Sequence, residues 1–137
     1  MALTHLLDTS VVSRLDSSAV REVIELLALT GRIGRAGITD LEVGYGSQNA
    51  RAWDQDMSDL SIFELVETTA DHLRRARQVQ RMLASRSQRG RKVPDLLIAA
   101  AAEQAGLILL HYDADFDLIA KVTGQECRWV VTAGTVD

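Results

Sequence analysis

Short apolar runs alternate with amphipathic helical patterns along the whole of this sequence. The first run, with Leu3, Leu6 and Leu7, stops abruptly at Asp8, which is typical of a short buried strand that ends in a polar turn. Strands that alternate with helices pair in parallel, because each helix returns the chain to the same edge of the sheet. We therefore predict an α/β fold in which a central parallel β-sheet is flanked by helices on both faces. The expected strands are 3–7, 33–38, 61–66, 107–112 and 128–131, and the expected helices are 9–15, 19–29, one beginning near 39, 49–60, 69–85, 94–105 and 116–122.

Two helix boundaries carry specific signals. Pro94 fits the first turn of a helix, where no N–H donor is needed, and Gly106 fits the end of the same helix. Thr39 and Glu42 have the spacing of a capping box, with Thr39 as the N-cap. This spacing predicts that the preceding strand runs to Ile38 and that a helix begins at Thr39.

Composition limits the class of protein. A chain of 137 residues with one proline and no low-complexity tract is expected to form a single domain, residues 1–137. The net charge of −4 excludes a global positive field, so any contact with nucleic acid must be local. Cys127 is the one cysteine, which excludes an intramolecular disulfide and a cysteine-based zinc site. The apolar run Leu96–Ala102 is too short to span a bilayer, so we expect a cytoplasmic protein with no membrane contact.

Acidic residues follow several of the expected strands. Asp8 follows the first strand, Glu42 lies in the helix after the second, Asp95 opens a later helix, and Asp113 and Asp115 follow the strand 107–112. Ligands of parallel sheets bind beyond the carboxyl ends of the strands, where these acids would meet. Two carboxylates about 4 Å apart repel each other by roughly 4 kcal/mol at an effective dielectric of about 20, so such a group needs a cation. All-oxygen ligands favour Mg²⁺ or Mn²⁺, and either ion suits phosphodiester hydrolysis. Each acid alone also fits a helix cap or a favourable interaction with a helix dipole.

Four stretches extend this interpretation to a family. The chain contains, in this order, Leu6–Ser10, Ile38–Glu42, Pro94–Ala102 and Asp113–Phe116. Together they resemble the PIN-domain family and, more narrowly, the VapC toxins of bacterial toxin–antitoxin modules. The resemblance implies a Mg²⁺- or Mn²⁺-dependent endoribonuclease that forms a homodimer and is blocked by a VapB-type antitoxin. Carried over by position, it implies that the catalytic acids are Asp8, Glu42, Asp95 and Asp113, and that the metal ligands are Asp8, Asp95, Asp113 and Asp115.

The residues around these acids give further expectations. Ser10 either orients a carboxylate or caps the helix that follows it. His111 lies two residues before Asp113, where many members of the family have Thr or Ser, so the hydrogen bonding at this point departs from the family pattern. We expect His111 to lie at the sheet edge next to the metal ligands, and His72 to be a solvated helix residue rather than a catalytic base.

A basic segment precedes Asp95. Residues 71–92 hold eight of the 15 basic residues against one acid. A basic helix is usually a solvated face, and it could also be reserved for the antitoxin. Because this one leads directly to Asp95, it would help RNA phosphates to approach an acidic pocket that otherwise repels them. The residues we expect to bind RNA are Arg86, Arg89, Arg91 and Lys92.

Two other functions fit parts of the pattern. A receiver-like Mg²⁺-binding signalling domain also places acids at the carboxyl edge of a parallel sheet. It would need paired acids after the first strand and a phosphorylatable aspartate after the third, whereas Asp8 stands alone and 61–66 leads into Glu67. A non-catalytic interaction module with the PIN fold is the second alternative, and an RNA cleavage assay distinguishes it from an enzyme.

Overall fold

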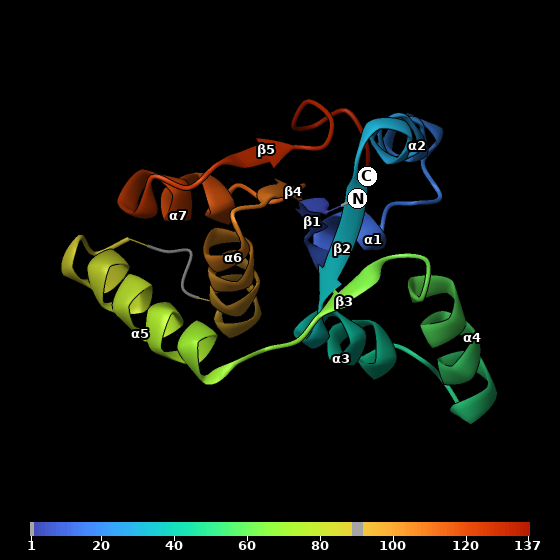
Figure 1. Ribbon diagram of the computed structural model, residues 1–137, viewed down its shortest axis with the longest axis horizontal. Helices are drawn as coiled ribbons and strands as arrows, with labels where there is room; N and C mark the ends of the chain where they lie inside the picture. Colours follow the sequence, from blue (N-terminus) through green and yellow to red (C-terminus); the bar gives the residue numbers. More distant parts are fainter. Residues whose placement is uncertain (1, 89–91) are drawn as a thin grey trace.

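A five-stranded parallel sheet forms the centre of the molecule. The computed structural model describes residues 2–88 and 92–137, so the predicted RNA contacts of Arg89 and Arg91 lie outside the described residues. The strand order is β3-β2-β1-β4-β5 and every neighbouring pair is parallel, which confirms the predicted fold class (Figure 1). The strands are β1 (Leu3–Leu7), β2 (Arg32–Ala36), β3 (Glu64–Val66), β4 (Ile108–His111) and β5 (Cys127–Trp129).

Helices cover both faces of this sheet, as predicted. Successive side chains of a strand point to opposite faces, so Leu6 and Leu7 of β1 enter two different cores. Leu6 packs with residues of α5, α6 and α7, whereas Leu7 packs with residues of α1 and α2 (Figure 1). The helices are α1 (Thr9–Val12), α2 (Ser18–Thr30), α3 (Gly37–Tyr45), α4 (Ala50–Leu60), α5 (Ala70–Ser85), α6 (Val93–Ala105) and α7 (Asp115–Thr123).

Helix α6 is the most buried helix and behaves as its sequence predicts. Pro94 lies in its first turn, and the helix ends at Gly106, which takes the left-handed conformation at φ 68°. Every residue of Leu96–Ala102 is buried, and the alanines let α6 pack closely against its neighbours. Burial of each of the larger side chains in this run stabilises the fold by about 1.5–3 kcal/mol. Among the described residues, no helix is both long and apolar enough to cross a membrane.

The predicted capping box at Thr39 is wrong. Helix α3 begins two residues earlier, at Gly37, and its N-cap is Ala36, whose side chain makes no capping bond. Strand β2 correspondingly ends at Ala36 rather than at Ile38. The physical reason is tertiary, because Thr39 is fully buried and both Thr39 and Glu42 contact the hydroxyl of Thr9 instead of backbone groups of α3.

A capping box does occur at the start of α5. The Thr69 hydroxyl accepts from the backbone N–H of His72, and the His72 ring accepts from the backbone N–H of Thr69. His72 is therefore buried rather than solvated, which corrects the expectation for this residue. Strands β3 and β5 are also shorter than predicted, at three residues each.

Candidate active site

The carboxyl ends of β1 and β4 bring the predicted acids to one edge of the sheet. The backbone N–H of Asp8 donates to the carbonyl of Leu110 at 2.9 Å, which joins the end of β1 to the end of β4. Asp113 lies two residues beyond β4, and Asp95 lies in the first turn of α6. Acids that are far apart in the chain therefore share one small region.

Three of the four predicted metal ligands form a compact group. Asp95, Asp113 and Asp115 each offer one carboxylate oxygen, and these atoms all lie within 4.8 Å of one another. Asp8 lies outside this group, but its charge raises the pKa of Asp95, so it stands close beside it. The charge of Glu42 in turn raises the pKa of Asp8. Glu42, Asp8 and the three-carboxylate group therefore lie close enough for the charge of each acid to act on its neighbour.

A tight turn holds Asp113 and Asp115 together. The backbone N–H of Asp115 donates to Oδ1 of Asp113 at 2.9 Å. Burial opposes ionisation of Asp113, but this hydrogen bond and the ammonium of Lys92 outweigh it and lower the pKa of Asp113 below its ordinary value. Asp113 therefore stays negatively charged in the metal-free protein.

Asp8 and Asp95 are buried acids with unsatisfied oxygens. One oxygen of Asp8, Oδ2, accepts from the backbone N–H of Ser10 at 2.9 Å. Within the described part of the chain, Oδ1 of Asp8 and Oδ2 of Asp95 are buried and accept no hydrogen bond, and Nζ of Lys92 lies 3.6 Å from Oδ2 of Asp95 as an ion pair. Burial is the main cause that raises the pKa of both groups, to about 7 for Asp95.

These buried oxygens fit a cation. Buried polar atoms in proteins normally have a partner, and a carboxylate oxygen without a donor is well placed to bind a metal ion. The donor set of the site consists of carboxylate oxygens, which hard divalent ions prefer over the nitrogen and sulfur ligands that are typical of zinc. The acidic group therefore suggests a divalent metal site.

Glu42 is positioned by two threonines. The Thr9 hydroxyl donates to Oε1 of Glu42 at 2.6 Å and lies 2.9 Å from the hydroxyl of Thr39. Because Thr9 directly follows Asp8, the start of α1 fixes two of the predicted catalytic acids at once. Neither Thr9 nor Thr39 was predicted from the sequence to support the site, and the only available signal was the position of Thr9 next to Asp8.

Ser10 and His111 support the two strand ends. The Ser10 hydroxyl accepts from the backbone N–H of Tyr112 at 2.8 Å, so Ser10 links α1 to the chain just beyond β4. His111 is fully buried between Phe116 and Trp129, with ring centroids 5.1 and 5.0 Å away. Its Nδ1 accepts from the backbone N–H of Asp113 at 3.2 Å. Burial lowers the pKa of His111, so the ring is neutral near pH 7 and orients the turn that carries Asp113.

Lys92 lies among the acids, where the sequence predicted a contact with RNA beside the site but no ion pairs with the acids. Its Nζ is 3.0 Å from Asp113, 3.3 Å from Asp115 and 3.6 Å from Asp95. The hydrogen bond to Asp113 is the main cause that raises the pKa of Lys92. The spacing of Lys92 and Asp95, three residues apart at the start of a helix, was a signal for one of these pairs. Arg86, another predicted RNA contact, is exposed at the end of α5.

Comparisons with known proteins agree with this geometry. The family model for the PIN domain matches residues 5–122. Ribonuclease VapC51 from Mycobacterium tuberculosis is 62% identical over 137 residues, which cover 100% of both chains. Ribonuclease VapC21 from the same species is 38% identical over 141 residues, covering 98% of this chain and 99% of that protein.

The fold also matches solved structures. A chain in the crystal structure of DNA-bound VapBC from Salmonella typhimurium superposes with a TM-score of 0.77 at 21% identity, covering 95% of this chain and 100% of that one. At this identity the structural match shows only that the two chains share a fold, whereas the sequence matches show common ancestry. The chain therefore belongs to the PIN-domain family and, within it, groups with the VapC proteins.

Proposed function

We propose that this chain, as one domain over residues 1–137, is an endoribonuclease and the toxin of a VapBC toxin–antitoxin module. The observation that carries the proposal is the meeting of Asp95, Asp113 and Asp115 beside Asp8, where two buried carboxylate oxygens have no donor among the described residues. The chain is 62% identical over its full length to a protein named as a ribonuclease, which supports RNA as the substrate. The reaction is hydrolysis of a phosphodiester bond.

The acids have two different roles in this reaction, which are metal binding and proton transfer. Asp8, Asp95, Asp113 and Asp115 would hold Mg²⁺, with Mn²⁺ as a substitute. When bound, such an ion supplies an acidified water and stabilises the negative charge that develops on the phosphate. Thr9 fixes the carboxylate of Glu42 at the same edge, where it can accept a proton from the attacking water. His111 and Ser10 keep the turns that carry Asp113 and Asp8 in place.

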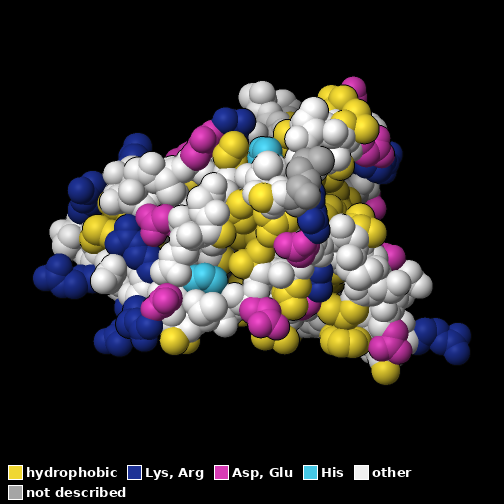
Figure 2. Space-filling view, viewed as in Figure 1, with side chains coloured by type: hydrophobic (Ala, Val, Ile, Leu, Met, Phe, Trp, Pro, Cys, Tyr) yellow, Lys and Arg dark blue, Asp and Glu magenta, His cyan; other side chains and the backbone are white. Residues whose placement is uncertain are grey.

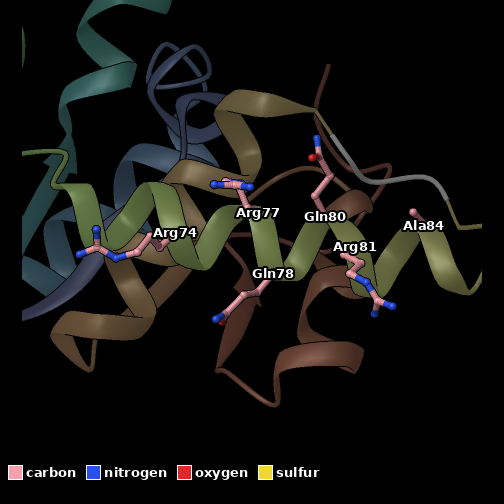
Figure 3. Close-up of a pocket in the computed structure, with 6 residues that line it drawn as sticks. All are labelled: Arg74, Arg77, Gln78, Gln80, Arg81 and Ala84. Carbon is pink, nitrogen blue, oxygen red and sulfur yellow. The ribbon is translucent and has the colours of Figure 1, made fainter.

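A basic face on α5 gives RNA a route to these acids. Basic side chains gather over α5 at the left of the molecule (Figure 2). Arg74, Arg77 and Arg81 project from this helix around a shallow depression of about 600 Å³ (Figure 3). Among residues 2–88 and 92–137, Arg77 and Arg81 have no acidic partner, whereas Arg74 pairs with Asp71.

Further basic residues lie between α5 and the site along the sequence. Beyond α5 the chain runs through Arg86, and then through Arg89 and Arg91 outside the described residues, to Lys92 at the acids. Because the protein has a net charge of −4, it would depend on such local positive charge to bind RNA. We propose that Arg86, Arg89, Arg91 and Lys92, together with this face of α5, contact RNA phosphates.

Exposed apolar side chains support assembly with protein partners. Leu41 and Tyr45 of α3 are 69% and 94% exposed, and Trp53 of α4 is 45% exposed. Large apolar side chains that gather on neighbouring helices usually mark a protein interface. We propose that the chain forms a homodimer and binds a VapB-type antitoxin that closes the acidic site. The names of the structural relatives, which are VapBC toxin–antitoxin systems, support an antitoxin as the partner.

An RNA cleavage assay with purified protein tests the function. We expect cleavage in Mg²⁺ or Mn²⁺ and none in EDTA. Asp113→Asn should lower the rate by on the order of 100-fold or more, because it removes a charge from the centre of the group. Asp54→Asn, at an exposed position on α4, is the matched control and should cleave at the wild-type rate. A wild-type protein that is folded and free of antitoxin, and that leaves every RNA intact in both metals, would indicate a non-catalytic module instead.

A further inference from the structure

The ammonium of Lys92 lies where a metal ion would be expected. It contacts the same three carboxylates that form the compact acidic group, at 3.0–3.6 Å. Lys92 is the N-cap residue of α6, so its backbone is fixed three residues before Asp95. The side chain is nevertheless 61% exposed, so it is not enclosed by the protein. The backbone of Lys92 is therefore fixed beside the acids, while its side chain has room to move away from them.

The acids would not hold the ammonium and a metal ion together. A divalent ion among Asp95, Asp113 and Asp115 would repel the ammonium twice as strongly as a second ammonium would at the same distance. The carboxylate oxygens that accept from Nζ are also oxygens that a metal would bind. Metal binding at this group therefore requires the amine to leave it. The flexible four-carbon stem of lysine allows this movement without a change in the backbone.

We propose that Lys92 is a displaceable internal cation, which holds Asp95, Asp113 and Asp115 together in the metal-free protein and leaves the group when a divalent ion binds. The proposal rests on the metal site of the proposed function, but it adds a step that the cleavage reaction does not require. The displaced amine remains tethered at the mouth of the site, where a phosphate of the substrate would approach. Lys92 is then a positioning residue that alternates between the acids and solvent.

A merely structural ion pair would behave differently from an exchanging one. If Lys92 only stabilises the fold, its removal lowers stability with and without metal and leaves metal affinity unchanged. If Lys92 exchanges with metal, its removal lowers stability only without metal and tightens metal binding. An exchanging Lys92 thus predicts lower stability without metal together with tighter metal binding. A variant that merely folds poorly would show the first effect without the second.

The chain offers a matched control for this test. It contains two lysines, and the second, Lys121, is exposed on α7. We would compare Lys92→Met and Lys121→Met with the wild type by calorimetric titration with Mn²⁺ alone, at low salt and pH 7.5. The melting temperature of each protein would be measured in EDTA and in saturating Mg²⁺. None of these measurements uses RNA or cleavage.

We expect Lys92→Met to bind Mn²⁺ about tenfold more tightly than the wild type, as the loss of three partly exposed ion pairs suggests. Its melting temperature should fall below that of the wild type in EDTA and match it in Mg²⁺, while Lys121→Met follows the wild type throughout. Equal or weaker Mn²⁺ binding by Lys92→Met would overturn the exchange and leave the metal site of the proposed function standing. Absence of Mn²⁺ binding by the wild type would overturn both.

Discussion

Asparagine in place of Asp95 should stabilise the metal-free protein at pH 8, because it removes a charge that the fold holds in an unfavourable place. Burial first, and then the charge of Asp8, raises the pKa of Asp95 to about 7. In the unfolded chain this carboxyl ionises near pH 4. Between these pH values the folded protein binds a proton that the unfolded chain has released, so the free energy of unfolding falls as the pH rises. The amide side chain of the Asp95→Asn variant carries no such charge and escapes this loss.

The size of the effect follows from the shift. A difference of about 3 pH units corresponds to about 4 kcal/mol, and screening by solvent and salt should leave about 2 kcal/mol to be measured. For a chain of this size, that gain raises the melting temperature by about 6 °C. The assay is thermal unfolding in EDTA from pH 5 to pH 8, with Asp54→Asn on α4 as the exposed control.

The dependence on pH and metal separates this cause from a general packing effect. The advantage of Asp95→Asn over the wild type should grow from pH 5 to pH 8 and vanish in saturating Mg²⁺, where the ion stabilises the ionised acid. An advantage that is absent at pH 8, or that is equal at every pH, would show that the fold does not disfavour the charge of Asp95.

Three further predictions address the rest of the site and its surroundings. Thr9→Val removes the hydroxyl that holds Glu42, so cleavage should slow about tenfold and the free energy of unfolding in urea should fall by about 1 kcal/mol. An unchanged cleavage rate would show that the reaction does not need Thr9 to position Glu42. Arg77→Gln with Arg81→Gln should flatten the dependence of log RNA affinity on log salt by about 1.4, or roughly 0.7 for each phosphate contact, while Arg51→Gln on α4 leaves it unchanged. Light scattering should give the mass of a dimer at micromolar concentration, and a monomeric mass would contradict the assembly.

The sequence predicted best those features in which local and global preferences agree. Pro94 and Gly106 mark the ends of α6 because their backbone preferences match those positions whatever surrounds them. Asp8 and Asp113 could be placed together because parallel strands deliver their carboxyl ends to one edge, and Asp95 joins them from the first turn of α6, which follows α5 rather than a strand. Neither inference depends on the direction of a side chain.

The features that the sequence did not predict depend on side-chain direction. Thr39 and Glu42 have the spacing of a capping box, yet the packing of α3 turns both toward Thr9, and a tertiary hydrogen bond replaces the local one. The capping box that does form, at Thr69, uses a histidine where the pattern expects Glu or Gln. The place of Lys92 among three acids likewise follows from where a flexible side chain points.

The acidic edge and the apolar core of the protein meet in a single helix. The first turn of α6 carries Asp95, a buried acid that costs stability when ionised, and the next two turns carry the run Leu96–Ala102, which is buried throughout. The burial of this run offsets the cost of holding Asp95 where the fold places it, because each large side chain contributes about 1.5–3 kcal/mol. The same helix therefore keeps the acids close enough to need a cation and keeps the fold stable until one binds.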